Sequence, residues 1–485
     1  MTKKSGVPAI RFKGFTDTWE QRKLGELVVI ERGGSPRPID DYITDSPDGL
    51  NWVKIGDAPE QGNYITSTKE KIRPEGLSKT REVHPGDLIL SNSMSFGKPY
   101  IMAIDGCIHD GWLSIKNTNN VFDLKFLCVL LGTDQMLTQY KSMAAGSTVN
   151  NLNKELVGNT TVTYPSVEEQ RTIGQFFEEI ENLITLHQRK FEKLHNLKKA
   201  MLAKMFPQNG SVYPEIRFAG FTDAWEQRGF SSVFEMLQNN TLSRADLSEE
   251  SGLAQNIHYG DVLIKYGEVL DVENEPLAYI NSDKIVTAMK NSYLQNGDVI
   301  IADTAEDTTV GKCSEIANLG DKTVLSGLHT IPVRPKEEYA SGYLGYYLNS
   351  NSYHDTLIPL MQGTKVTSIS KSALQGTSIS YPKSIDEQAK ISAYFLNLDH
   401  LITLHQRKYI HYLLYHFSTK NAIIFDEFFL LPIPFYHISR SEFAQLQKIP
   451  GKFRGFLIIQ IFLHTSPTCG NRQYSSFFRE CGESS

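Results

Sequence analysis

The hydrophobic and polar positions of this chain follow two patterns, and the longer one predicts a helix. From Ile173 the apolar positions recur in alternating steps of four and three, the period of a helix that packs along one seam. Its acidic residues gather early and its basic residues late, as the helix dipole favours. A helix over 167–205 would be on the order of 58 Å long, ended by Pro207 and Gly210. Its seam residues are Ile173, Phe177, Ile180, Ile184, Phe191 and Leu194, with His187 between them.

The same seam returns in the second half of the chain. It is formed there by Ile391, Phe395, Leu398 and Ile402, with His405 in the place of His187. Two such helices would pair as an antiparallel coiled coil and set the separation of the domains that they join. The alternative is that each is an amphipathic helix packed only on its own domain. His187 and His405 have no Cys or carboxylate at metal-ligand spacing, so we interpret them as interface histidines.

The second pattern consists of short apolar runs bounded by Gly, Asp, Asn and Pro, which is typical of half-buried strands. These runs cover 87–90, 100–104, 261–264 and 298–301, and helical patterns cover 122–131 and 339–348. Strands and helices mixed in this way predict an α/β fold for each half of the chain.

A duplication relates the two halves. PAIRFKGFTDTWEQR at 8–22 returns as PEIRFAGFTDAWEQR at 214–228, and LITLHQRK at 183–190 returns at 401–408. Between these blocks the halves diverge, but glycines keep their order: Gly86 with Gly297, Gly97 with Gly311, Gly111 with Gly327, and Gly146 with Gly363. A period of about 210 residues is far longer than that of a solenoid. We therefore predict two α/β domains separated by long helices, with a pseudo-twofold internal repeat.

These observations divide the chain into seven segments. They are an entry segment 1–22, domain 1 over 23–164, a helical spacer 165–213, a repeated entry segment 214–228, domain 2 over 229–381, a second spacer 382–408, and a tail 409–485. The similarity between the halves ends at Lys408, and Pro432 and Pro434 interrupt the tail. We therefore expect the second spacer helix to be truncated, by a frameshift or a recombination junction.

The composition mainly excludes classes of protein and kinds of site. The 485 residues are 40% hydrophobic and 21% charged, with no apolar run long enough to span a membrane. The N-terminus lacks a secretory signal, so we expect a cytoplasmic protein. Five scattered cysteines without a C-x-x-C pair predict free thiols rather than disulfides or a zinc site. With a net charge of −6, any surface for DNA must be a local basic patch.

Turn-rich segments with Arg, Lys, Ser, Thr and Asn are the candidates for such a patch. These residue types contact phosphates and base edges. The candidate DNA-binding residues are Arg32, Arg37, Thr80, Arg81, Asn92, Ser93, Lys98, Ser147 and Thr148 in the first half, and Thr304, Lys312, Thr364 and Lys365 in the second. For any one of these residues a solvated turn is the alternative. The loop 303–312 is longer and more acidic than 91–98, so the two loops would read different bases.

The duplicated motifs resemble those of the DNA-specificity subunits of type I restriction-modification systems. The resemblance is carried by the repeated I-R-F-x-G-F-T-D-x-W-E-Q-R entry, by Gly146-Ser147-Thr148 with Leu152-Asn153-Lys154, and by Pro165 with Glu169-Gln170 and Ile173. Pro382, Glu387-Gln388, Ile391, Leu398-Asp399 and Leu401-Ile402 are the partners in the second half. The similarity covers residues 8 to about 408.

The resemblance implies two target-recognition domains, each reading one half of a split sequence in double-stranded DNA. It implies that the spacer helices fix the gap and dock two methylation subunits, and that restriction subunits join the larger complex. The methylated base would be adenine, flipped into a partner's pocket. S-adenosylmethionine, ATP and Mg²⁺ would then be cofactors of the partner subunits, with none in this chain.

The chain itself lacks the motifs of an enzyme. Neither an Asn-Pro-Pro-Tyr tetrapeptide nor a Gly-x-x-x-x-Gly-Lys-Ser/Thr phosphate loop occurs in the sequence. A self-contained DNA-modifying enzyme is therefore disfavoured, and no catalytic or metal-binding residue is expected. The alternative that stays open is an inactive or dimer-dependent specificity subunit, caused by the altered tail.

Overall fold

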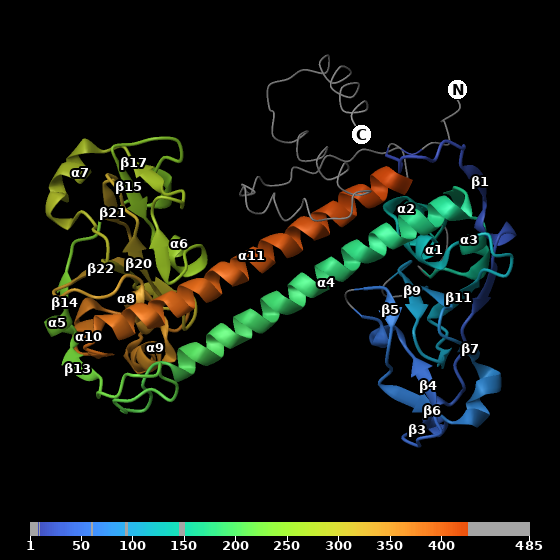
Figure 1. Ribbon diagram of the computed structural model, residues 1–485, viewed down its shortest axis with the longest axis horizontal. Coiled ribbons are helices and arrows are strands. Elements are labelled where there is room, and N and C mark those ends of the chain that lie inside the picture. The colour runs from blue at the N-terminus through green and yellow to red at the C-terminus, as the bar shows by residue number, and fades with distance from the viewer. Residues whose placement is uncertain (1–7, 9, 60–61, 93–95, 145–150, 425–485) are drawn as a thin grey trace, which may run out of the picture. The chain divides into compact units, whose positions relative to one another are not determined.

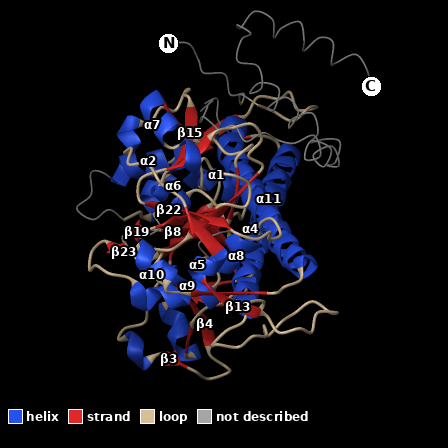
Figure 2. Ribbon diagram, turned by 90° about the vertical axis from the view of Figure 1, so that its left-hand side faces the viewer, coloured by secondary structure: helices blue, strands red, loops and turns tan. Residues whose placement is uncertain are grey.

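The computed structural model describes residues 8, 10–59, 62–92, 96–144 and 151–424, which lie in one compact unit. Within it, two mixed α/β domains are joined by two long helices (Figure 1). Figure 2 shows these helices, α4 (Val167–Lys204) and α11 (Ile385–Ile424), side by side. The predicted fold class is confirmed. No helix among the described residues is long and apolar enough to cross a membrane.

Domain 1 contains two five-stranded sheets and a two-stranded pair. The sheet orders are β3-β6-β4-β10-β7 and β2-β11-β8-β9-β5, and β1 pairs with β12. The strands are β1 (Glu20–Lys23), β2 (Val29–Arg32), β3 (Ile43–Thr44), β4 (Leu50–Val53), β5 (Tyr64–Ile65), β6 (Glu70–Ile72), β7 (Arg81–Val83), β8 (Leu88–Ser91), β9 (Pro99–Met102), β10 (Gly106–Ile108), β11 (Trp112–Lys116) and β12 (Thr161–Tyr164). Its helices are α1 (Leu124–Leu131), α2 (Asp134–Ala144) and α3 (Lys154–Gly158).

Domain 2 is built on a related plan. A five-stranded sheet has the order β14-β22-β18-β20-β16, a three-stranded sheet the order β17-β15-β21, and two pairs are β13-β24 and β19-β23. The strands are β13 (Glu226–Gly229), β14 (Phe234–Met236), β15 (Ala254–Ile257), β16 (Val269–Asp271), β17 (Ala278–Ile280), β18 (Val299–Ala302), β19 (Thr304–Ala305), β20 (Cys313–Ala317), β21 (Val324–Ser326), β22 (Thr330–Pro335), β23 (Thr367–Ser368) and β24 (Ser378–Tyr381). The helices are α5 (Phe230–Val233), α6 (Tyr259–Ile264), α7 (Asp283–Ala288), α8 (Tyr343–Asn349), α9 (Asn351–Leu357) and α10 (Lys371–Gln375).

One of the predicted strands is a helix. Residues 261–264 belong to α6, whose start is capped by His258, because Nδ1 of that ring accepts a hydrogen bond from the backbone of Gly260. Only Val262 of this helix is fully buried, and Ile264 is 88% exposed. An apolar run of four residues is too short to separate a strand from a helical turn by periodicity.

The glycine landmarks mark equivalent turns. Gly86 and Gly297 both have positive φ, as do Gly97 and Gly311, and each pair makes the same backbone hydrogen bonds in its own half. The pairing of Gly111 with Gly327 is wrong, and the pairing of Gly146 with Gly363 is not tested because Gly146 lies outside the described residues. The pairing of β10 with β4 in domain 1 and of β21 with β15 in domain 2 makes Gly327 equivalent to His109. The equivalent of Gly111 is therefore His329, which has a φ of 55°. Gly111 does not share the positive φ of His329, so the order of glycines could not reveal this equivalence.

The repeated entry segments hold the long helices through an arginine fork. Nε and Nη2 of Arg11 each lie 2.7 Å from the carboxylate of Glu169, whose side chain is 1% exposed. Arg217 makes the same bidentate contact to Glu387, at 2.7 and 2.8 Å. Charge-assisted forks of this kind are among the stronger hydrogen bonds in proteins. The arginine shared by the two entry segments thus has a structural role.

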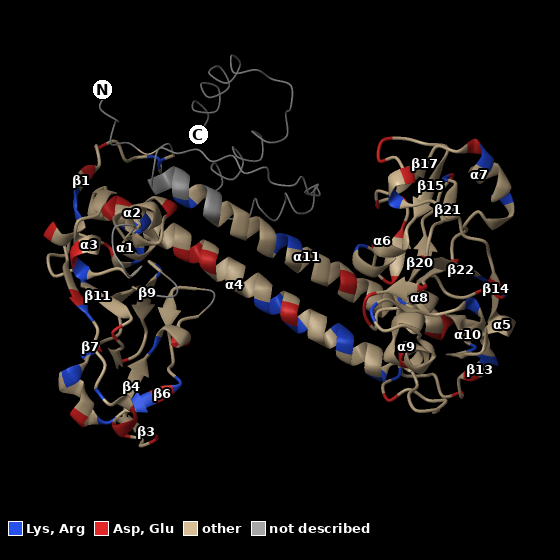
Figure 3. Ribbon diagram, turned by 180° about the vertical axis from the view of Figure 1, so that it is seen from behind, with Lys and Arg blue, Asp and Glu red and all other residues tan. Residues whose placement is uncertain are grey.

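Helices α4 and α11 run antiparallel. Phe177 packs on His416, His187 on His405, and Lys198 pairs with Asp399. The residue numbers therefore rise along α4 as they fall along α11. Figure 3 shows acidic residues early and basic residues late in α4, as the sequence suggested. Helix α11 continues through Ile424, so the expected truncation of the helix at Lys408 is corrected. The residues after Lys408 keep apolar side chains at the contact, including Tyr415, which is 7% exposed.

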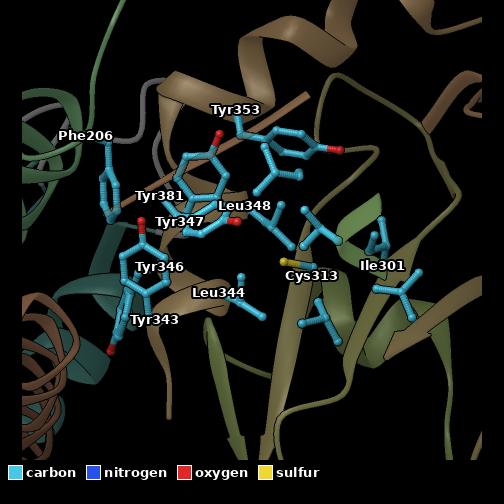
Figure 4. Packing of buried hydrophobic residues seen from close by; sticks show 14 of the residues in the cluster. Phe206, Ile301, Cys313, Tyr343, Leu344, Tyr346, Tyr347, Leu348, Tyr353 and Tyr381 are labelled. Carbon is cyan, nitrogen blue, oxygen red and sulfur yellow. The ribbon is translucent and has the colours of Figure 1, made fainter. Parts of the chain in front are cut away.

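The seam positions are divided between helix pairing and domain packing. Ile173, Phe177, Ile180, Ile184, Ile391, Phe395 and Leu398 are buried, and Phe191, Leu194 and Ile402 are partly buried. Phe395 and Leu398 pack in the core of domain 2. Phe206, just after α4, belongs to the same core, near Tyr343 and Tyr347 (Figure 4). Each helix therefore packs on its own domain near its start and on the other domain near its end. Both interpretations of the seam hold, for different parts of it.

Candidate nucleic-acid interface

In domain 1, three loops meet at Asp110. Its backbone carbonyl accepts hydrogen bonds from Nε of Arg32 at 3.2 Å and from Nδ2 of Asn92 at 2.9 Å. Its carboxylate contacts Oγ of Ser35 at 3.1 Å, and Nη2 of Arg37 lies 3.6 Å away. Residues from 32–37, 92 and 109–111 are thus brought to one place by a residue that the sequence analysis did not single out. We call Asp110 and these contacts the Asp110 hub.

Two glycines let the first loop of the hub pack tightly. A Cβ atom at Gly33 would lie 2.2 Å from the carbonyl oxygen of His109, and one at Gly34 would lie 2.6 Å from that of Lys79. No side chain fits at such distances. The loop that carries Arg32 and Arg37 is therefore pinned between 108–110 and 79–80, and two of the predicted segments become neighbours.

The hub fixes the protonation state of His109. Burial lowers the pKa of this imidazole, and the nearby positive charges lower it further, against the opposing effect of Asp110. Its Nδ1 accepts a hydrogen bond from the backbone of Gly111 at 2.9 Å, and Nε2 lies 2.9 Å from Oδ1 of Asp110. A neutral ring with its proton on Nε2 satisfies both contacts.

Several basic side chains lie around the hub, and most of them pair with acidic ones. The basic side chains are Arg32, Arg37, Lys54, Lys79, Arg81 and Lys116, and the acidic ones are Glu31, Glu70 and Asp110. Glu31 is shared by Arg81 and Lys116, at 3.3 and 3.0 Å. Basic side chains gathered at one place on a protein with a net charge of −6 can contact a phosphate backbone.

The remaining first-half candidates have different surroundings. Asn92 is 2% exposed and its side chain is committed to Asp110, while Oγ1 of Thr80 donates to the carbonyl of Leu77. Nζ of Lys98 lies 4.9 Å from the ring centre of Tyr100 and 3.4 Å from the carbonyl of Pro59, apart from the hub. Ser93, Ser147 and Thr148 lie outside the described residues.

Domain 2 has a different set of side chains at the equivalent place. Asp303 stands where domain 1 has Asn92, and its backbone N–H donates to the carbonyl of His329 as that of Asn92 does to Gly111. Oδ1 of Asp303 lies 2.8 Å from Oγ1 of Thr304 and 3.2 Å from Nδ1 of His329. We call this group the Asp303 hub.

The other second-half candidates are divided between this surface and the interior. Strand β23 pairs with β19, placing the exposed Thr364 and Lys365 in the loop next to Thr304. Lys312 instead donates to the carbonyl of Leu263 at 2.7 Å, and burial lowers the pKa of its amine.

The described residues contain no group of three or more His, Cys, Asp and Glu side chains that could hold a metal ion. Among them Cys107, Cys128 and Cys313 are buried free thiols. Burial raises the pKa of Cys128 to about 12, which disfavours the reactive thiolate. The exposed groups of the two hubs are hydrogen-bond donors and acceptors on turns, which suits recognition.

Comparisons with known proteins identify this architecture. The family model for the type I restriction modification DNA specificity domain matches twice, at residues 16–196 and 222–411. The type I restriction enzyme MjaVIII specificity subunit of Methanocaldococcus jannaschii is 19% identical over 81% of this chain and 88% of its own. The putative MjaX specificity subunit of the same organism is 21% identical, over 81% and 89%.

A solved structure supports the fold. The crystal structure of the type I restriction-modification system S subunit from M. genitalium aligns with a TM-score of 0.50 at 12% identity, covering 87% of this chain and 99% of that one. With two matches that together span more than half of its length, the chain belongs to the family of type I restriction-modification DNA-specificity subunits.

Proposed function

We propose that this subunit reads a split DNA sequence, one half with each domain, and directs adenine methylation and restriction by partner subunits. The observation that carries the proposal is that one fold occurs twice with different exposed side chains at the same place, the Asp110 hub and the Asp303 hub. Equivalent scaffolds with different donors and acceptors suit the reading of two different half-sites. The antiparallel helices between them would set the gap.

The exposed face of the helix pair suits a protein partner. Leu186, Leu197 and Leu401 are 45%, 38% and 40% exposed, and Lys190 and Lys193 lie near them on α4. Leucines exposed on a helix are a docking signal when several share one face. The helix pair would dock two methylation subunits. S-adenosylmethionine, ATP and Mg²⁺ would then be bound by the methylation and restriction subunits.

The test is the methylome of a restriction-free host that co-expresses this chain with its methylation subunit. We expect one split motif with adenine modified on both strands. Replacing residues 229–381 by domain 2 of a relative should change one half of the motif and leave the other half intact. Absence of any motif, while the same methylation subunit works with another specificity subunit, would contradict the proposal. Nothing in the comparisons supports the alternative of an inactive or dimer-dependent variant.

A further inference from the structure

We infer that Arg32 and Arg37 determine the specificity of domain 1 by hydrogen-bonding to guanine, so that the half-site read by this domain contains at least one essential G·C pair. The inference rests on the proposed function and adds the chemistry of one half-site. It depends on how the Asp110 hub holds the two guanidinium groups, on which of their N–H groups remain for a ligand, and on the contrast with domain 2.

Arg32 is held by one edge of its guanidinium group. Nε donates to the carbonyl of Asp110 at 3.2 Å, and the terminal nitrogens make no hydrogen bond to any of the described residues. The side chain is exposed at the end of β2, where Gly33 begins the pinned loop. The hub thus fixes the direction of the side chain and leaves the outward pair of N–H groups for a ligand.

Arg37 is held more loosely at the other end of the same loop. Its side chain is 77% exposed, and Nη2 lies 3.6 Å from Oδ2 of Asp110, while Oδ1 of the same carboxylate contacts Ser35 and His109. An exposed ion pair at this distance contributes little to stability. The guanidinium group can therefore leave Asp110 for a stronger acceptor without a large cost to the fold.

Guanine is the base that matches these donors. Its O6 and N7 atoms present two acceptors side by side in the major groove, which the planar fork of arginine contacts in a bidentate manner. Adenine offers one acceptor beside a donor at the same place. An arginine already oriented by the protein loses less conformational freedom when it binds.

Domain 2 lacks this arrangement at the equivalent position. The Asp303 hub contains Thr304 and His329 but no arginine. Arg244 is 60% exposed, but its guanidinium group pairs at 2.8 Å with Asp261, which is not part of the Asp303 hub, and that of Arg334 is fixed by the buried Asp298. Because the Asp303 hub itself contains no arginine, arginine readout is assigned to the half-site of domain 1.

The test compares the methylomes of the wild-type subunit, Arg32→Ala, Arg37→Ala and the charge-preserving Arg32→Lys and Arg37→Lys variants, each with its methylation subunit. Lys141→Ala removes one exposed positive charge from α2, away from the hub, and is the matched control. We expect the alanine and lysine variants to accept other bases at a G·C position of one half-site, with the other half-site unchanged. The preference for guanine at that position should fall about 10- to 100-fold. Circular dichroism checks that each variant is folded.

Three outcomes would overturn the inference. The first is a wild-type motif whose domain 1 half has no G·C pair, with this half identified by domain exchange. The second is an unchanged motif in all four arginine variants. The third is a uniform loss of binding that lysine restores, because this would indicate phosphate contacts. In each of these cases the split motif itself would survive, and with it the proposed function, whereas a wild-type subunit that yields no motif would refute both.

Discussion

The C-terminal ends of α4 and α11 occupy equivalent places in the repeat but are anchored by different chemistry. At the end of α4, Nζ of Lys198 lies 2.8 Å from Glu268 and 2.6 Å from Asp399. The equivalent pair in α11 is His416 with Glu181, at 3.3 Å. An always-charged amine between two carboxylates is thus replaced by an imidazole beside one.

The apolar packing is also better at the end of α4 than at the end of α11. Phe206, just after α4, is fully buried and stacks on Phe395 at 5.9 Å, and Leu202 packs against the same core. The position of Leu202 corresponds to Lys420 in α11, where burial lowers the pKa of the amine because it disfavours the charged form. The helix continues beyond Lys408, but the side chains it presents to domain 1 fit that place less well than those at the other end.

The largest effect is expected from removing Lys198. Lys198→Ala would leave the partly buried carboxylates of Glu268 and Asp399 without their shared cation, and should lower the free energy of unfolding by about 3 kcal/mol. His416→Ala should cost about 1 kcal/mol or less, since its contact to Glu181 is single and partly exposed. Urea unfolding measures both, with the exposed Lys199→Ala as the control. Equal losses at the two ends would contradict the difference between them.

A smaller effect of opposite sign is expected at the other end. Lys420→Leu should raise the free energy of unfolding by about 1–2 kcal/mol, because an apolar side chain of similar size replaces a desolvated amine. The reciprocal change, Leu202→Lys, should destabilise the end of α4 by burying a charge without a partner. Thermal unfolding of both variants against the wild type gives the comparison. If Lys420→Leu is destabilising, the amine of Lys420 makes a favourable contact in the wild-type protein.

The smallest effect concerns pH and the middle of the helix pair, between the two ends. The Nδ1 atoms of His187 and His405 lie 2.8 Å apart, with Tyr412 stacked on His187 at 5.6 Å. Burial, followed by the charges of His405, Lys408 and Lys190, lowers the pKa of His187 to about 4, and burial also lowers that of His405. Because the unfolded histidines take up protons near pH 6.5 while the folded pair does not, this stabilisation is complete above about pH 6.5. It should be lost as the pH falls toward 4.

The measurement is the midpoint of urea unfolding at pH 7.5 and 5.5, for the wild type and for a variant with both histidines changed to Asn. The double variant should lose less stability than the wild type over this interval. The difference between the proteins is needed because burial raises the pKa of Glu315 to about 7, and this buried acid contributes with the opposite sign in the same range. Identical pH dependence in the two proteins would show that the histidine pair does not contribute.

The sequence predicted which loops form the candidate site, but not which residues of these loops contribute to it. Arg32, Arg37 and the neighbouring 79–81 segment were identified from turn-rich, basic sequence, and the structure brings them together. Asp110 and His109 were missed, because a single Asp in a His-Asp-Gly turn has no periodic or motif signal. Asn92 and Lys312 were selected for their residue type, but whether such a side chain points outward depends on neighbours that are distant in sequence.

The duplication, the mixed α/β class, the long helices and the family were all predicted from the sequence. These depend on identities and periods along the chain, which need no knowledge of distant contacts. Only the tertiary structure decided that α11 runs on to Ile424, that residues 261–264 are helical, and that two hubs with different side chains occupy one place in the fold. Each of these outcomes is set by packing between segments far apart in sequence, where burial and hydrogen bonding override the weak local preference of a short run.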